Sequence, residues 1–154
     1  MAYIFLCLLT GLLCFGDLHL KSWIEEHLRK GDREKLGKGT FELRRVHNKG
    51  FAMNVADNKP EYVRIVSVVI CVVMAIWALF VWKKETCPVK KVCAAFMLAG
   101  AISNTYDRMK REYVVDYIGV NTKCKKLNRI TFNLADVFIF VGAVTYAIAE
   151  VFGE

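Results

Sequence analysis

The stretch ITFNLADVFIFVGAVTYAIA, residues 130–149, contains a single charged side chain, that of Asp136. Roughly twenty mostly apolar residues are what a helix needs to cross the hydrocarbon core of a bilayer. A carboxylate at membrane depth is costly to bury and marks a functional site by default. The stretch therefore predicts a membrane-spanning helix and a chemical role for its one acid.

The composition of the whole chain also indicates a membrane protein. Hydrophobic residues make up 55% of the 154 residues, and only two residues are proline. Such a chain is too apolar and too short for an ordinary soluble domain. The formal net charge is +7, but Lys and Arg cluster between the apolar runs, without a basic stripe that has interleaved aromatics. We therefore expect contacts with lipid headgroups and no binding of nucleic acid.

Hydropathy predicts one integral membrane domain, residues 1–154, with four spans at about residues 2–23, 62–82, 89–106 and 134–152. Residues 1–16 are uncharged but lack the basic start and the small-residue cleavage site of a secretory signal, so we interpret the first span as retained. Four crossings place both termini on one side of the membrane. The two longer loops, at about residues 24–61 and 107–133, then share the other side.

Both of these loops are expected to contain a short strand. Residues 40–46 alternate apolar and charged side chains, and residues 113–120 are rich in β-branched and aromatic side chains. In the second strand a period of two places Asp116 on the same face as Val114 and Ile118. We expect its carboxyl group to be partly desolvated. The predicted fold class is an all-α membrane protein, a four-transmembrane-helix bundle with a small β element.

The cysteines indicate neither a metal site nor a disulfide framework. No two of them have the Cys-x-x-Cys spacing of a zinc or redox site. Three lie inside apolar runs, where they serve as small hydrophobic side chains. We expect no metal and no cofactor. The six are Cys7, Cys14, Cys71, Cys87, Cys93 and Cys124.

Polar residues gather near the end of the third expected span. Asn104, Asp107 and Arg108 are three and four positions apart and share one helix face, with Gly100 one turn earlier. A functional cluster explains this spacing. An Asp–Arg pair that caps and anchors the helix end explains it equally well.

Two more polar pairs have both a functional and a structural interpretation. Asn133 and Asp136 stand three apart at the start of the fourth span. There, Asn is a good N-cap and Asp complements the helix dipole, so capping alone is one explanation of the pair. Asp17 and Lys21 stand four apart, as a simple ion pair on a helix would.

Five blocks follow one another along nearly the whole chain. They are Asp17-x-x-x-Lys21, Val46-His47-Asn48-Lys49-Gly50-x-Ala52, Gly100-Ala101-x-x-Asn104-x-x-Asp107-Arg108, Val114-Val115-Asp116-Tyr117-Ile118 and Phe132-Asn133-Leu134-Ala135-Asp136. Together they resemble bacterial lipoprotein signal peptidase, signal peptidase II. In the third block Ser103 and Thr105 stand where that family usually has Gly and Leu. In the second, Gly-Phe-Ala-Met at 50–53 stands where Gly-Ala-Ala-Phe is common.

The resemblance implies an aspartic endopeptidase of the bacterial cytoplasmic (inner) membrane. Such an enzyme removes the signal peptide of a prolipoprotein on the amino side of a diacylglyceryl-modified cysteine. Carried over residue by residue, the catalytic pair is Asp116 and Asp136. We expect a monomer that contacts its prolipoprotein substrates and membrane lipids, with the site and a β-cradle-like loop region at the extracytoplasmic face. The implied substrate-binding or supporting residues are Asp17, Lys21, Asn48, Gly50, Asn104, Asp107, Arg108 and Asn133.

The charges of the loops predict the orientation less clearly than the resemblance does. The loop at 83–91 contains four lysines and would be cytoplasmic, as the positive-inside rule requires. The loops at 24–61 and 107–133 contain more basic residues in total, so a raw count predicts the reverse. The rule weakens with loop length, and we follow the resemblance.

Two other classes of protein are open from the residues alone. A small transport or ion-relay protein would use its Asp and Arg residues across the depth of the bilayer, with possible repeats of its spans. Here the acids gather at one end, and no repeat is visible. A structural or assembly protein with capped helix ends predicts instead that Asp116 and Asp136 can be replaced by Asn without loss of function.

Overall fold

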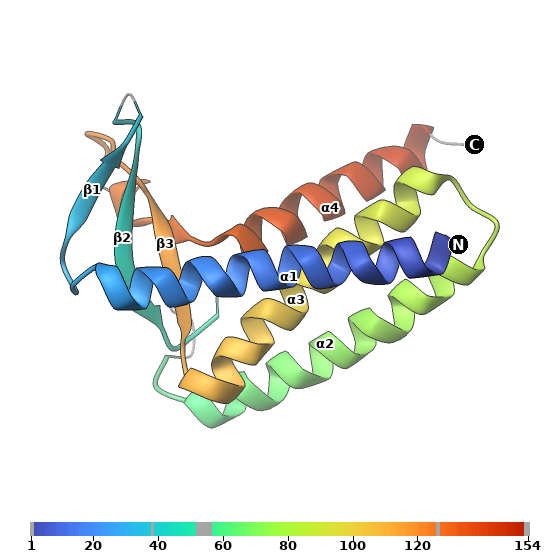
Figure 1. Ribbon diagram of the computed structural model, residues 1–154, viewed down its shortest axis with the longest axis horizontal. Helices are drawn as coiled ribbons and strands as arrows, with labels where there is room; N and C mark the ends of the chain where they lie inside the picture. The colour runs from blue at the N-terminus through green and yellow to red at the C-terminus, as the bar shows by residue number, and fades with distance from the viewer. Residues whose placement is uncertain (1, 38, 52–56, 126, 153–154) are drawn as a thin grey trace.

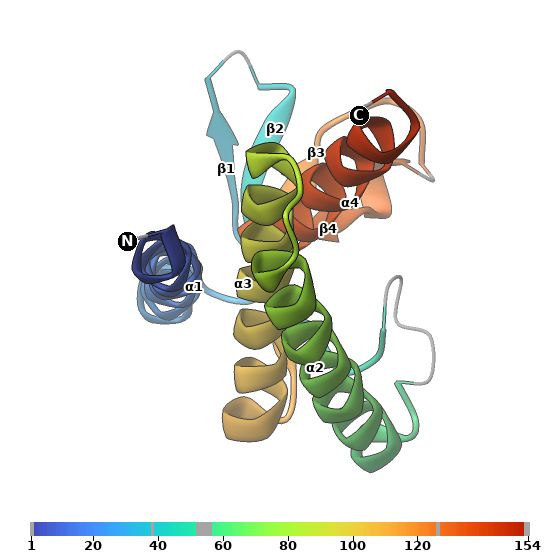
Figure 2. The ribbon, with the colours of Figure 1, turned by 90° about the vertical axis from the view of Figure 1, so that its right-hand side faces the viewer.

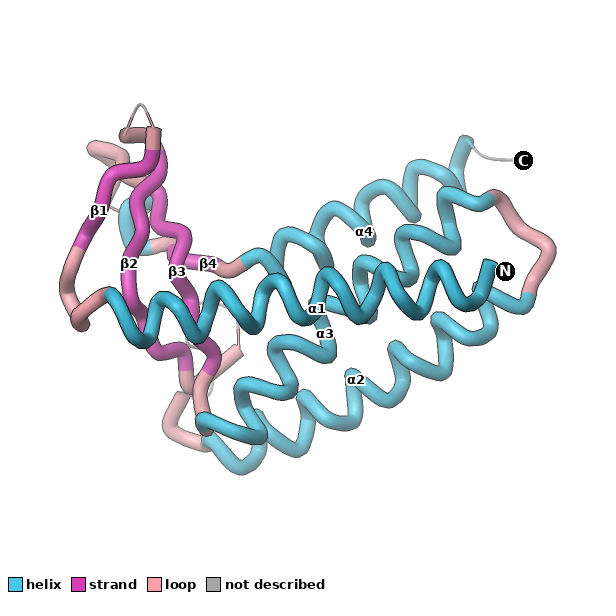
Figure 3. The backbone as a smooth tube through the Cα atoms, viewed as in Figure 1, coloured by secondary structure: helices cyan, strands magenta, loops and turns pink. Residues whose placement is uncertain are grey.

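The computed structural model describes residues 2–37, 39–51, 57–125 and 127–152. Ala52 and Met53 of the second sequence block lie outside the described residues. The expected fold class is confirmed, because four helices form a bundle with a small sheet at one end (Figures 1 and 3). The elements are α1 (Ala2–His27), β1 (Arg33–Leu36), β2 (Phe41–Asn48), α2 (Pro60–Lys83), α3 (Pro88–Arg111), β3 (Val114–Val120), the 3-10 helix η2 (Leu127–Arg129), β4 (Thr131–Phe132) and α4 (Leu134–Phe152).

Three of the described helices, α1, α2 and α4, are long and apolar enough to cross a membrane. Their apolar side chains mostly face outward, since at most 22% of the most apolar window of each helix is buried. Leu8, Val73 and Phe140 are examples of large exposed side chains. Apolar surface of this extent is rare on soluble proteins. It fits helices whose outer faces contact lipid chains.

The central helix of the bundle is α3, which contacts each of the other three. Figure 2 shows α1 and α4 on opposite sides of it. Ala94, Ala95 and Ala99 are fully buried, and such small residues allow close approach of neighbouring helices. The expected span at 89–106 lies within α3 and is less apolar than the other three helices. Its polar side chains face the protein, and its crossing of the membrane stays a prediction.

Both termini and the α2–α3 connection lie at the end of the bundle away from the sheet (Figure 1). At the sheet end, α3 is followed by Glu112, whose φ of 67° is left-handed. This sharp turn leads the chain directly into β3. Asp107 Oδ2 accepts a hydrogen bond of 3.1 Å from the backbone N–H of Val115, which ties the last turns of α3 to the new strand.

The sheet is antiparallel, with the strand order β1-β2-β3-β4. The two predicted strands correspond to β2 and β3, and their register places Val46 opposite Asp116. Arg44 on β2 donates to the side chain of Glu42 and to both oxygens of Asn128, which joins the sheet to η2. Gly119 gives this arginine room, because a Cβ there would lie 2.3 Å from Arg44 Nε. Asp116 thus lies on β3, an inner strand of the sheet that pairs with β2 on one side and β4 on the other.

Candidate active site

The residues selected from the sequence converge where the sheet meets the helices. The structure joins all ten of them into one connected set of hydrogen bonds and ion pairs. Every helix except α2 supplies part of the set, together with β3 and the end of β2. They are Asp17 and Lys21 on α1, Asn48 and Gly50 at the end of β2, Asn104, Asp107 and Arg108 on α3, Asp116 on β3, and Asn133 and Asp136 at the start of α4.

Asp116 is nearly inaccessible to solvent, with 4% of its surface exposed. Its Oδ1 accepts a hydrogen bond of 2.8 Å from the side-chain amide of Asn133, and its Oδ2 accepts one of 3.1 Å from that of Asn48. Burial, followed by the negative charge of Asp136, raises the pKa of Asp116 to about 7, although the two amide donors act in the opposite direction. The carboxyl group can therefore hold or release a proton near neutral pH.

Asp136 binds two different partners through its two oxygens. Its Oδ2 accepts the backbone N–H of Asn133 at 3.1 Å, while Asn133 Oδ1 accepts the backbone N–H of Asp136 at 2.9 Å. This reciprocal pair is a capping box at the start of α4. Its Oδ1 accepts a hydrogen bond of 2.8 Å from the side-chain amide of Asn104. The capping interpretation is thus confirmed, and it leaves one oxygen of Asp136 facing the cluster.

The three asparagine amides can adopt only one orientation each. An amide oxygen accepts and an amide NH₂ donates, so a neighbour that can only donate fixes which end it meets. For Asn48 that neighbour is the backbone N–H of Gly50 at 3.0 Å, and for Asn104 it is Lys21 Nζ at 2.8 Å. For Asn133 it is the backbone N–H within the capping box. Each NH₂ group consequently faces an aspartate.

A buried charge cluster lies behind Asn104. Lys21 is fully buried, and its Nζ lies 2.8 Å from Asp17 Oδ2 and 3.4 Å from Asp107 Oδ2. Arg111 supplies a second positive charge, with its Nε 3.5 Å from Asp107 Oδ1. Two positive and two negative groups balance, as buried ions require. The ion pair expected between Asp17 and Lys21 is confirmed, and it belongs to a larger cluster.

Three residues of this cluster, Arg111, Ser103 and Tyr117, were not selected from the sequence. Ser103 donates to Asp17 Oδ2 at 2.5 Å and accepts from Lys21 Nζ at 3.1 Å. Tyr117 donates through its hydroxyl to Asp17 Oδ1 at 2.9 Å and accepts the backbone N–H of Leu134 at 3.1 Å. Burial, followed by the charge of Asp17, raises the pKa of Tyr117, so it remains a neutral donor. Asp17 lies 86 residues from Ser103 and 100 residues from Tyr117 along the chain, so the spacing of residues in the sequence does not indicate these contacts.

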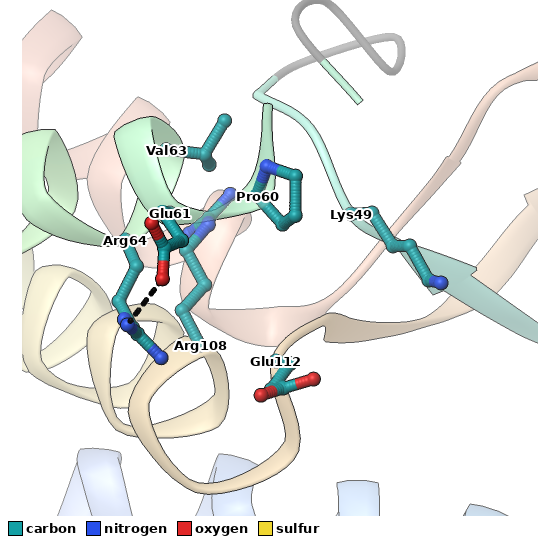
Figure 4. A pocket seen from close by; sticks show the side chains of 7 residues that line it. All are labelled: Lys49, Pro60, Glu61, Val63, Arg64, Arg108 and Glu112. Atoms are coloured by element: carbon teal, nitrogen blue, oxygen red, sulfur yellow. Dashed lines mark ion pairs between the residues drawn. The ribbon is translucent and has the colours of Figure 1, made fainter. Parts of the chain in front are cut away.

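Arg108 connects α3 to the turn after β2. Its Nη2 donates to the carbonyl oxygen of Gly50 at 2.8 Å, and its Nη1 donates to that of Asn104 at 3.4 Å. The planar guanidinium also lies over the Phe51 ring, 5.9 Å from its centre. Figure 4 shows Arg108 beside a cavity of about 70 Å³ at the start of α2. The other residues that line the cavity are Lys49, Pro60, Glu61, Val63, Arg64 and Glu112.

The buried and half-buried aspartates of this site lie together at the sheet end of the bundle. An ion relay would need such acids through the depth of the membrane, so their distribution does not fit the transport alternative. Within the part of the chain that the structure describes, no group of three or more His, Cys, Asp or Glu side chains is arranged to hold a metal ion.

Known proteins match the chain over most of its length. The family model of signal peptidase (SPase) II matches residues 9–152. A lipoprotein signal peptidase of Clostridium novyi is 29% identical over 140 residues, which cover 89% of this chain and 93% of the relative. One of Lactococcus lactis subsp. lactis is 30% identical over 134 residues, which cover 87% and 85%.

A solved structure has the same fold. It is a bacterial membrane enzyme determined by the in meso method, with a TM-score of 0.81 and 22% identity over 95% of this chain and 87% of that one. These matches confirm the prediction of a lipoprotein signal peptidase, an aspartic peptidase, and of a multi-pass membrane protein of bacteria. The chain belongs to the signal peptidase (SPase) II family.

Proposed function

We propose that Asp116 and Asp136 are the catalytic pair with which this chain removes the signal peptide of prolipoproteins. The observation that best supports this proposal is that Asn133 contacts both carboxyl groups. Its side chain donates to Asp116, and its backbone N–H donates to Asp136. One residue thereby keeps two acids of distant sequence segments at the same place.

Two carboxyl groups held close together in a poorly solvated site do not both ionise easily. They share one proton and titrate as a coupled pair. The burial of Asp116 and the partial burial of Asp136 are consistent with this behaviour. We assign the shared proton to the pair and not to either residue.

Peptide hydrolysis by such a pair needs no covalent intermediate. The ionised carboxylate removes a proton from a water molecule, whose oxygen attacks the scissile carbonyl carbon. The protonated partner donates to the carbonyl oxygen. Collapse of the tetrahedral intermediate breaks the C–N bond, while the carboxyl group that took the proton from water gives it to the departing amine and the other carboxylate accepts the proton of one hydroxyl of the intermediate. The pair thus returns to its singly protonated state.

The supporting residues hold this pair or bind the substrate near the cut. Asn48 and Asn104 each donate an amide to one of the acids. Arg108 lies at the turn formed by residues 48–50, where its fork of donors suits substrate carbonyl groups. We propose that the cut precedes a diacylglyceryl-modified cysteine, whose lipid chains lie against the exposed apolar faces of the helices.

We place the enzyme in the bacterial cytoplasmic membrane with its sheet on the extracytoplasmic side. The lysines at 83, 84, 90 and 91 lie at the opposite end of the bundle, which would then be cytoplasmic in accordance with the positive-inside rule. A monomer in a single domain suffices, because one chain supplies all ten residues of the site.

The proposal is tested by cleavage of a diacylglyceryl-modified prolipoprotein by the purified protein in lipid. Asp116→Asn and Asp136→Asn should each lower the rate about 10²- to 10⁴-fold, the usual contribution of general acid–base catalysis. Asp32→Asn is the matched control, because this exposed carboxylate accepts a local hydrogen bond from the backbone of Arg29 and has no other side-chain partner among the described residues. It should cleave like the wild type.

Folding of each variant is checked by its thermal unfolding in detergent. This check matters for Asp136, which also caps α4. Loss of cleavage by well-folded variants supports the catalytic pair. Full activity of either variant would remove that residue from the pair, and equal cleavage of the unmodified prolipoprotein would contradict the diacylglyceryl requirement.

A further inference from the structure

We infer that Ser103 is a positioning residue: with Lys21, it keeps the amide of Asn104 in the orientation that donates to Asp136. The inference rests on the proposed function, because it assigns Ser103 to the reaction through Asp136.

The first step concerns the three N–H groups of the Lys21 ammonium. They have three hydrogen-bond acceptors, at 2.8 Å from Asp17 Oδ2, 3.1 Å from Ser103 Oγ and 2.8 Å from Asn104 Oδ1, and Asp107 Oδ2 lies 3.4 Å away as a further ion-pair partner. Lys21 and Ser103 are fully buried, so water does not replace a missing acceptor. The three directions together fix the position of Nζ.

The second step concerns Asn104. An ammonium group only donates, so it holds the amide oxygen of Asn104 and turns the NH₂ group toward Asp136, 2.8 Å from its Oδ1. If the amide turned over, its oxygen would face the carboxylate. The hydrogen bond to Asp136 would then be replaced by repulsion between two acceptors. The hydrogen bond that Asp136 accepts from Asn104 therefore depends on the position of the Lys21 ammonium group.

The third step concerns the Ser103 hydroxyl. It donates to Asp17 Oδ2 at 2.5 Å, the oxygen that also accepts from Lys21. Without the hydroxyl, Lys21 loses one acceptor, and Asp17 loses one donor. The ammonium is then free to move toward the two carboxylates of Asp17 and Asp107, away from Asn104.

A matched control is available in α2. Ser67 is also a buried serine on a helix, with 7% of its surface exposed, and its hydroxyl donates at 2.7 Å to the carbonyl of Val63 in the same helix. Ser67→Ala removes the same atom as Ser103→Ala but leaves the charge cluster intact. It separates an effect of position from the general effect of losing a buried hydroxyl.

The kinetic test measures kcat and KM on the diacylglyceryl-modified prolipoprotein. Ser103→Ala should lower kcat about fivefold, the ratio that corresponds to one ordinary hydrogen bond, with KM unchanged. In an Asn104→Ala background the same substitution should have no effect, because the residue through which it acts is gone. Ser67→Ala should leave kcat unchanged. Equal losses in both backgrounds, or no loss in either, would overturn the inference.

A second test does not depend on activity. In protein labelled with ¹⁵N-asparagine, the side-chain NH₂ signal of Asn104 is the one missing from Asn104→Ala. Its exchange with solvent should be about fivefold faster in Ser103→Ala, by the same hydrogen-bond ratio, and unchanged in Ser67→Ala. Unchanged exchange in Ser103→Ala would refute the positioning role.

These two readouts separate the inference from the proposed function. If the wild type does not cleave the substrate, the proposed function fails, while the exchange rates still decide whether Ser103 holds Asn104. Should Ser103→Ala fail to fold, Ser103→Gly replaces it, since that variant also lacks the hydroxyl.

Discussion

Gly100 on α3 lies so close to Ala135 on α4 that a Cβ at position 100 would be 2.3 Å from the carbonyl oxygen of Ala135. A backbone oxygen cannot move aside as the tip of a flexible side chain can. The contact fixes the distance between the two helices just before Asp136. The packing of α3 against α4 therefore also determines where Asp136 lies in the site.

Gly100→Ala should force the two helices apart and lower stability by about 1–3 kcal/mol, the usual cost of overpacking. Because Ala135 precedes Asp136, the cleavage rate should fall as well. Thermal unfolding and kcat measure the two effects. Gly16→Ala is the control, since an added Cβ there meets no atom within 4 Å and Ala suits a helix better than Gly. Equal stability of the two variants would contradict the close contact.

Lys21→Met should destabilise the fold by about 3–5 kcal/mol, because it leaves Asp17 buried without a positive partner and removes one of the two positive groups beside Asp107. Chemical unfolding in detergent measures the change. Arg33→Met removes a side chain that is 56% exposed from its ion pair with Glu42 and should change stability by less than about 1 kcal/mol. A comparable loss of stability in both variants would show that burial of the ion pairs does not determine the cost of removing them.

The pH dependence of cleavage should show an alkaline decline near neutrality. In the proposed mechanism, activity requires one shared proton, and burial and the charge of Asp136 raise the pKa of Asp116 to about 7. The value of kcat/KM should therefore fall as the pH rises through about 7. A profile that stays flat to well above this pH would argue against a proton held by the pair.

Stability should depend on pH through the same group. The pKa of Asp116 is raised from 3.8 to about 7 in the folded chain, so the folded state binds a proton that the unfolded state has released. The resulting stabilisation is fully present below pH 4 and is lost as the pH rises through about 7. The Asp116→Asn variant should lose this part of the pH dependence of Tm. An unchanged slope in the variant would exclude Asp116 as its source.

Two native cysteines test the orientation in the membrane. Cys124 is exposed in the segment between β3 and η2, whereas Cys87 lies between α2 and α3 at the other end of the bundle. In intact cells a membrane-impermeant maleimide should label a variant that retains only Cys124 and spare one that retains only Cys87. Both should react after permeabilisation. The opposite labelling pattern would reverse the proposed topology.

Much of the helical architecture follows from the sequence because three of the described helices expose apolar faces over most of their length. The limits of that signal are visible in α3, whose polar residues Asn104 and Asp107 face other helices, so that hydropathy alone describes it less well. The strands β2 and β3 have the expected composition. The two other strands escaped prediction because Arg33–Leu36 is short, mostly charged and exposed, and Thr131–Phe132 has only two residues.

The cluster of site residues was predicted through the sequence blocks, while its internal connections were not. Spacing alone left open whether Asn133 and Asp136 only cap α4, and the structure shows capping by one carboxylate oxygen together with a hydrogen bond from Asn104 to the other. Ser103 and Tyr117 act through Asp17, which lies 86 and 100 residues away along the chain. Periodicity describes neighbours on one helix or strand, so contacts of this kind become visible only in three dimensions.

The double use of Asp136 has a consequence for the newly made protein. The oxygen that closes the first turn of α4 and the oxygen that faces Asn104 belong to the same carboxyl group. A chain in which that turn is frayed loses the position of the acid at the same moment. In the proposed mechanism, Asp136 is therefore in position to act only once the first turn of α4 has formed.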